Sequence, residues 1–301
     1  MRRLVIVLLF IAVLSLPVLL FLRESGDGGG GERVALIDIS GVIADTGGYG
    51  GSGDPRTIVG FLRQAETDPR VKAVVVRINS GGGSPAAAEE IYDAIRRIRS
   101  RGKPVVASMG DVAASAAYYI AAAADRIVAN PSTTTGSIGV ISQTFVIGRL
   151  LDELGITVET VVSGPFKDAT SQFRPMTEEE RAYMQALVND VLEQFVHAVA
   201  EGRGLDVEYV RSLADGRIFT GRQAHSLRLV DELGGLEDAI MLAGRLAGIP
   251  GRPRVITLRR QPTLSERLLQ LYLPALDGLI DPSHGDVIRW LGVPPWGYRL
   301  R

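Results

Sequence analysis

Between residues 71 and 124 the chain alternates short apolar runs with glycine- or serine-containing turns and helix-forming stretches. Val71–Ile78 has the continuous apolar core of a strand that is buried on both faces. The glycine-rich turn Asn79–Pro85 leads into isoleucines at helical spacing as far as Ser100, and a second β-branched run, Pro104–Ser108, precedes the alanine-rich stretch Met109–Ala124. This order of strand, helix, strand and helix predicts an α/β fold with a mainly parallel sheet and surrounding helices.

The flanking sequence extends the same pattern in both directions. A helix is expected to start at Asp54-Pro55, and Thr177 followed by three glutamates is typical of a helix cap. Further strands are expected at 34–39, 125–130, 136–142, 157–162 and 254–258, and further helices at 145–154, 177–201, 236–246 and 264–280. The pattern therefore predicts one folded domain over residues 33–280 and a proline-containing tail over 281–301.

The N-terminus carries an apolar run from Leu4 to Leu22 that is long enough to cross a bilayer as a helix. Arg2 and Arg3 precede this run, which favours a cytoplasmic N-terminus and places the rest of the chain outside the cytoplasm. The alternative is a cleaved secretory signal, but residues 21–24 offer no small-residue cleavage site. We therefore expect a transmembrane signal anchor at 1–23 and a flexible glycine-rich tether at 24–32.

Composition excludes several classes of function. The chain of 301 residues has no cysteine, which excludes disulfides, thiolate metal sites and a cysteine nucleophile. Its three histidines lie far apart without metal-ligand spacing, so no metal or other cofactor is expected. The formal net charge of −1 gives no basic stripe for nucleic acid.

Three separated loops are candidates for a common site, because loops that follow parallel strands meet at one edge of a sheet. They are the glycine loop Gly81–Gly83, the turn at Ser115 and the loop that carries Lys167. Amide hydrolysis needs a nucleophile, a base and N–H donors for the oxyanion, and a lysine serves as base where burial disfavours its ammonium form. Taken singly, Ser115 is better explained as a packing serine and Lys167 as a solvated loop lysine.

The order and spacing of six motifs resemble the signal peptide peptidase A family, the serine–lysine membrane peptidases of the Clp/crotonase-like fold. The motifs are Asn79–Gly83, Met109–Tyr119, Thr135–Val140, Ser163–Asp168, Phe219–Ala224 and Leu229–Gly235. They cover most of the chain from Val34 to about Leu246. Two departures from the family pattern are Gly81, where proline is usual, and the alanines Ala116 and Ala117, where glycines are usual.

The resemblance implies a role for individual residues. Ser115 would attack the scissile carbonyl, Lys167 would be the general base and Ser137 would hold the lysine by a hydrogen bond. The oxyanion would be bound by the backbone N–H groups of Gly83, or of Gly82, together with that of Ala116. The Asp168 side chain is expected to point away from Lys167.

The resemblance also implies a setting in the cell. The protein would be a single-pass protein of the cell membrane that cleaves peptides in or near the membrane, such as released signal peptides. It would form a homo-oligomer, expected to be an octamer, in which neighbouring subunits build the substrate groove. Two alternatives stay open: a crotonase-like acyl-thioester enzyme, and an inactive membrane scaffold that binds peptides without cutting them.

Overall fold

The computed structural model describes residues 31–45 and 52–259. The expected anchor, most of the tether, the domain boundary at residue 280 and the tail lie outside these ranges. Within them, no helix is long and apolar enough to cross a bilayer.

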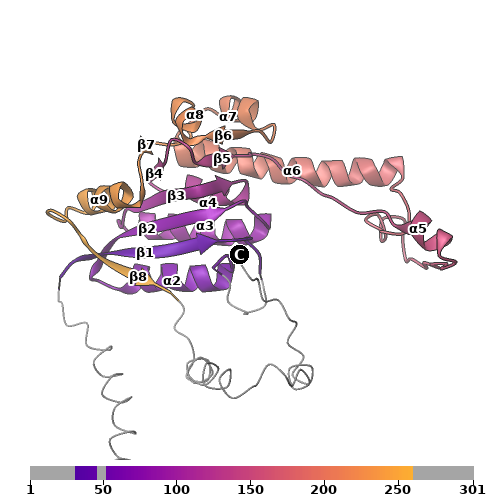
Figure 1. Ribbon diagram of the computed structural model, residues 1–301, viewed down its shortest axis with the longest axis horizontal. Helices are drawn as coiled ribbons and strands as arrows, with labels where there is room; N and C mark the ends of the chain where they lie inside the picture. The colour runs from indigo at the N-terminus through magenta and orange to yellow at the C-terminus, as the bar shows by residue number, and fades with distance from the viewer. Residues whose placement is uncertain (1–30, 46–51, 260–301) are drawn as a thin grey trace, which may run out of the picture. The chain divides into compact units, whose positions relative to one another are not determined.

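One eight-stranded sheet organises the described chain (Figure 1). The strands are β1 (Arg33–Ser40), β2 (Val71–Ser80), β3 (Val105–Ala114), β4 (Arg126–Ala129), β5 (Thr134–Gly136), β6 (Ile218–Thr220), β7 (Glu232–Leu233) and β8 (Arg254–Leu258). Their order is β6-β5-β3-β2-β1-β8, with β4 between β3 and β7 as a branch. Every pair is parallel except β5 with β6, which confirms the expected mainly parallel α/β fold.

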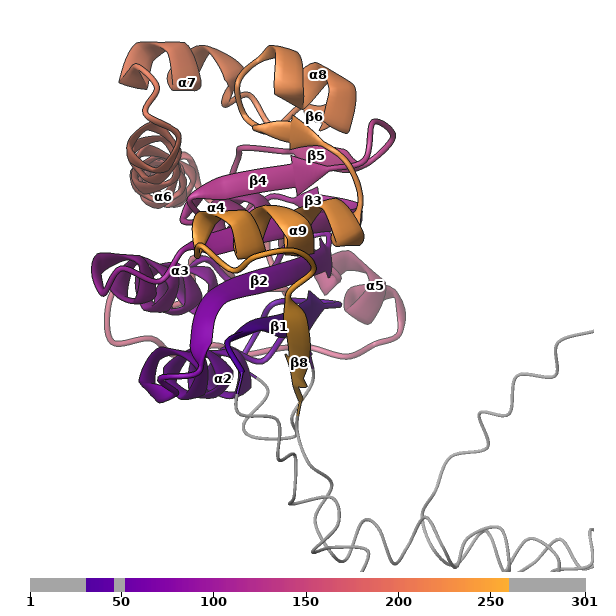
Figure 2. The ribbon, with the colours of Figure 1, turned by 90° about the vertical axis from the view of Figure 1, so that its left-hand side faces the viewer.

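Helices cover both faces of the sheet (Figure 2). They are α2 (Pro55–Thr67), α3 (Pro85–Ser100), α4 (Ala116–Ala122), α5 (Gly148–Glu153), α6 (Glu178–Arg203), α7 (Val207–Leu213), α8 (Gly221–Ser226) and α9 (Leu236–Leu246). Alternate side chains of the central strands pack in two cores, a large one with α2, α3, α4 and part of α6, and a smaller one with α9. Burial on both faces explains the continuous apolar runs of the central strands.

Local sequence fixes where the helices start. Asp54 accepts a hydrogen bond from the Thr57 N–H and Pro55 occupies the first turn of α2, while Ser84 and Pro85 do the same for α3. Thr177 forms a reciprocal capping box at the start of α6. Each helix therefore leaves its preceding loop in a defined direction, and for α3 that loop is the glycine loop.

Strand β3 changes partner along its length. Its first half, Val106–Ser108, pairs with β4, and its last three residues, Val112–Ala114, pair with β5. The sequence predicts a strand over Pro104–Ser108 and a turn at Ser115 before the helix. The strand in fact continues through Gly110 to Ala114, because β5 supplies a second set of backbone partners. Ser115 therefore lies at the carboxyl end of a central strand, directly before α4.

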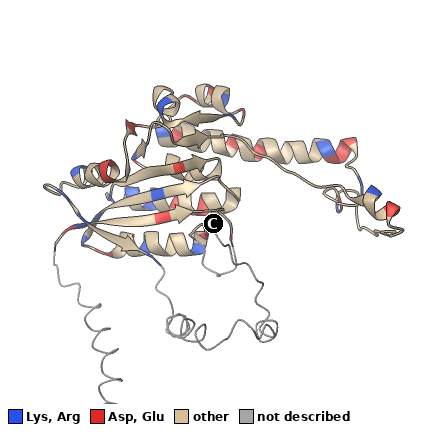
Figure 3. Cartoon of the chain, viewed as in Figure 1, with Lys and Arg blue, Asp and Glu red and all other residues tan. Residues whose placement is uncertain are grey.

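The segment 141–176, called the arm below, lies between β5 and α6 and contains α5. Figure 1 shows the arm and the first half of α6 projecting beyond the sheet, and Figure 3 shows acidic and basic residues together at the start of α6. Ala169 is the one buried side chain of the arm. The other end of α6 packs closely on α4, where a Cβ on Gly202 would lie 2.1 Å from the Ala122 carbonyl oxygen.

The arm is also where the predicted secondary structure is wrong. The strand expected at 136–142 ends at Gly136, the helix expected at 145–154 is limited to α5, and residues 157–162 form no strand. Strand formation requires a neighbouring backbone, and among the described residues none pairs with 157–162. An apolar alternating sequence alone does not supply that neighbour.

Candidate active site

Ser115 has a backbone conformation that serine rarely adopts. Its φ of 56° and ψ of −127° match the first central position of a type II′ turn, which glycine usually occupies. Two backbone hydrogen bonds hold it there: its N–H donates to the Gly136 carbonyl at 2.9 Å, and its carbonyl accepts from the Tyr119 N–H at 3.0 Å. Within the described chain the Ser115 hydroxyl makes no hydrogen bond, so it stands free at the start of α4.

The glycine loop lies directly over Ser115. A Cβ built on Gly82 would stand 2.9 Å from the Ser115 Cβ and 3.2 Å from the Ala116 nitrogen, and the φ of Gly82 is +113°. Only glycine combines this conformation with so close an approach. The loop after β2 and the first turn of α4 therefore bring their backbones together around the serine.

Two backbone N–H groups at this contact have no acceptor among the described residues. The Ala116 N–H belongs to the first turn of α4, where intrahelical acceptors are lacking. The Gly83 N–H is also free. The bridge between this loop and Ile43 is made by the Ile43 N–H, which donates to the Gly82 carbonyl, and by the Ser84 N–H, which donates to the Ile43 carbonyl. A carbonyl oxygen at Ser115 would meet two donors of the kind that stabilise an oxyanion.

Ser80 explains which glycine is available as a donor. The buried Ser80 hydroxyl accepts the Gly82 N–H at 3.1 Å, so this N–H is already occupied. Asn79 fixes the same region, since its side-chain oxygen accepts from the Val112 N–H at 3.1 Å where the β2–β3 register shifts. The sequence motif contained both residues, but their supporting role follows only from the strand pairing.

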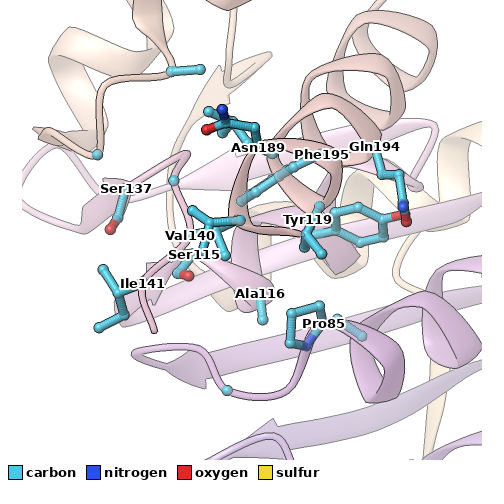
Figure 4. A pocket seen from close by; sticks show the side chains of 18 of the residues that line it. Pro85, Ser115, Ala116, Tyr119, Ser137, Val140, Ile141, Asn189, Gln194 and Phe195 are labelled. Carbon is cyan, nitrogen blue, oxygen red and sulfur yellow. The ribbon is translucent and has the colours of Figure 1, made fainter. Parts of the chain in front are cut away.

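A cavity of about 530 Å³ opens at Ser115 (Figure 4). Gly81, Gly83, Ala116 and Ser137 line it together with Ser115, so most of the residues expected at the site come together. Ser137 has a φ of 50°, and its N–H donates to the Arg217 carbonyl at 2.8 Å. The rest of the wall comes mainly from the middle of α6, through residues such as Leu192 and Phe195.

Lys167 does not line this cavity. It is exposed on the arm, where its N–H closes a turn onto the Gly164 carbonyl at 3.1 Å. Asp168 is engaged by Arg174, whose Nη2 donates to Asp168 Oδ1 at 2.9 Å and whose Nη1 donates to Glu180 at 2.8 Å. Asp168 thus points to Arg174, and no carboxylate of the described residues pairs with Lys167.

Tyr119 is a cavity residue that the sequence did not single out. It lies one helical turn after Ser115, and its ring packs between Tyr92 and Phe195 at centroid distances of 4.9 and 5.2 Å. Burial, followed by the negative charge of Glu89, raises the pKa of Tyr119 to about 12. The signal available in the sequence was its i+4 spacing from the serine.

Fold and site together define a class: a serine peptidase built on a Clp-like α/β sheet. The Clp protease profile matches residues 54–135, and the profile of Peptidase family S49 matches residues 97–249. The chain belongs to peptidase family S49, the family of the signal peptide peptidase A enzymes, and is a serine peptidase.

Two relatives illustrate this membership, and one solved structure shares the fold. The chain is 41% identical to "Putative protease slr0021" of Synechocystis sp., covering 79% of this chain and 83% of the relative. It is 37% identical to "Putative signal peptide peptidase SppA" of Enterococcus faecium, covering 71% and 63% respectively. A mutant of the membrane-bound stomatin-specific protease 1510-N has a similar fold, with a TM-score of 0.52, 14% identity, and coverage of 77% of this chain and all of that one.

Among the described residues, no group of three or more His, Asp or Glu side chains is placed to hold a metal ion. The family membership favours a peptidase over the acyl-thioester enzyme and the inactive scaffold that the sequence alone left open.

Proposed function

We propose that this protein is a membrane-anchored endopeptidase with Ser115 as nucleophile and Lys167 as general base. The observation that carries the proposal is that Ser115 has a strained backbone and an unpartnered hydroxyl, beside the free N–H groups of Gly83 and Ala116. Lys167 takes the hydroxyl proton as Ser115 Oγ attacks the scissile carbonyl, and then gives it to the leaving amine. Water next hydrolyses the acyl-enzyme with the lysine again as base, and Ser137 holds the lysine amine.

We propose further that Lys167 acts on the serine of a neighbouring copy. In its own chain Lys167 lies on the arm and does not line the Ser115 cavity. The arm also exposes large apolar side chains, with Ile141 89%, Phe145 72% and Val161 98% exposed. Apolar surface on this scale is typical of a protein–protein interface, so a second copy of the chain is the partner that both features favour. The octamer implied by the family resemblance is part of this proposal.

The ion pairs of the arm support a lysine base. Arg174 binds Asp168, the acid next to Lys167, and no carboxylate of the described residues forms an ion pair with Lys167. A general base must be unprotonated before it accepts a proton, and an adjacent carboxylate would oppose that state.

The proposed substrates are membrane-associated peptides such as released signal peptides. A relative named signal peptide peptidase and the apolar wall of the cavity support this substrate class. The apolar run at residues 4–22 supports a single-pass location in the cell membrane with an extracytoplasmic catalytic domain.

The test is cleavage of an apolar peptide by separate Ser115→Ala and Lys167→Ala variants of the full chain. Both are expected to be inactive, whereas the control Lys72→Ala, which removes a surface lysine paired with Glu32, keeps its activity. Full activity in either of the first two variants would contradict the dyad.

Mixing the two inactive variants tests the shared site. When equal amounts assemble at random, about one quarter of the sites combine an intact serine with an intact lysine from the neighbour, so about one quarter of the activity returns. No recovery in mixed oligomers that have been shown to form would contradict a site shared between copies.

A further inference from the structure

The Ser115 cavity extends past the serine along α4. In Figure 4, Ser137 and Tyr119 lie on opposite sides of Ser115. Pro85, Phe195 and Gln194 lie on the Tyr119 side (Figure 4). Leu192 and Glu89 also line the cavity, and the charge of Glu89 acts on Tyr119. This end of the cavity therefore combines an apolar wall with polar groups.

The charged residues that line the cavity are acids. Of the described residues that line it, two are acids, Glu89 and Asp215, and none is a lysine or arginine. Arg217 neutralises Asp215, with its Nε 2.8 Å from both carboxylate oxygens. Glu89 is exposed and has no hydrogen-bond or ion-pair partner among the described residues. Glu89 is thus the carboxylate of the cavity that is left uncompensated.

The groups around Glu89 do not supply a cation. Arg96, two helical turns further along α3, forms an ion pair with Glu201 and lies over the Tyr92 ring at 5.7 Å from its centroid. The Tyr119 hydroxyl makes no hydrogen bond within the described chain, and its oxygen can accept one from a donor. Two unused acceptors therefore flank an apolar wall beside the nucleophile.

Resting on the proposed peptidase function, we infer that Glu89 is a specificity-determining residue that selects a lysine or arginine near the cleaved bond of the substrate. The aliphatic stem of such a side chain packs on Leu192 and Phe195, and its cationic tip reaches Glu89 and the Tyr119 hydroxyl. Lysine and arginine combine an apolar stem with a charged tip in this way. The substrate class is then an apolar peptide that carries a basic residue at or next to the cleavage site.

The test uses three apolar peptides that differ at one position beside the cleaved bond, which holds lysine, glutamine or glutamate. The wild-type full chain is expected to prefer lysine over glutamine and to cleave the glutamate peptide least. Glu89→Gln is expected to lower the lysine-to-glutamine ratio of kcat/KM by up to about fivefold, the upper end of the range for an exposed ion pair. Glu89→Lys is expected to reverse the order of the lysine and glutamate peptides.

Glu90→Gln is the matched control, because Glu90 is the adjacent exposed acid of α3 and does not line the cavity. It makes the same change in net charge and should keep the wild-type ratio. Equal ratios in wild type, Glu89→Gln and Glu90→Gln would overturn the assignment of Glu89. The proposed dyad fails on a different result, cleavage by Ser115→Ala, so the two failures are distinguishable.

Discussion

Replacing Ser115 by glycine is expected to abolish peptidase activity and to stabilise the fold. A non-glycine residue in such a conformation costs about 1–3 kcal/mol. Glycine removes that strain but loses about 0.4–1 kcal/mol through the greater freedom of the unfolded chain. The lost hydroxyl costs little, because it has no hydrogen-bond partner among the described residues. The net gain in unfolding free energy is therefore about 0.5–2 kcal/mol.

The comparison that isolates this effect is Ser115→Gly against Ser115→Ala. Both lack the nucleophile, but alanine keeps the Cβ and with it the backbone strain. Thermal or urea unfolding at matched protein concentration should place glycine above alanine, by roughly 1–8 °C in Tm for a domain of this size. Equal stability of the two variants would refute the view that the fold holds Ser115 under strain.

Four further predictions concern the surroundings of the serine and the arm. Gly81→Ala should raise the unfolding free energy by about 0.4–1 kcal/mol, because nothing lies within 4 Å of its Cβ. Gly82→Ala should lower the unfolding free energy by about 1–3 kcal/mol and impair cleavage, because its φ is positive and its Cβ would meet Ser115. Equal stability of the two variants in urea unfolding would contradict the backbone conformation of the glycine loop. Ser80→Ala should lower kcat more than it changes KM, because it breaks the hydrogen bond that holds the Gly82 N–H. An unchanged kcat would show that Ser80 does not position the glycine loop. The Arg174 hydrogen bonds lower the pKa of Glu180 from 4.5 to about 2. The resulting stabilisation is present above pH 4.5 and lost as the pH falls through about 2. The rate at which pepsin cuts the arm should therefore rise in the wild type, relative to Glu180→Gln, as the pH falls. A wild-type-to-variant ratio of cutting rates that stays constant with pH would contradict this role.

Local signals predicted most of the sheet and its helices. The helix expected at 236–246 and the strand expected at 254–258 coincide with α9 and β8, and the capping threonine marks the start of α6. These features depend on neighbours in sequence, such as caps, apolar spacing and β-branched runs. The continuation of β3 to Ala114 depends instead on β5, which no pattern within β3 reveals.

The candidate site divides in the same way. The sequence and the family resemblance placed the glycine loop, Ser115, Ser137 and Lys167 in one site; the first three line one cavity, and Lys167 does not. The position of Lys167 could not be predicted, because the path of the arm is decided by contacts such as those of Arg174 with Asp168 and Glu180. The role of Lys167 stays a prediction.

The strained conformation of Ser115 depends on parts of the chain that follow it in sequence. Its N–H needs the Gly136 carbonyl of β5, and Ser137 in turn needs the Arg217 carbonyl, about 80 residues further along the chain. Contacts between such distant residues form late, since long loops must close first. A chain that has paired β1, β2 and β3 without β5 already has most of its central sheet. Its Ser115 still lacks the Gly136 carbonyl that holds the strained conformation. The strained serine therefore belongs only to a chain whose sheet extends through β5.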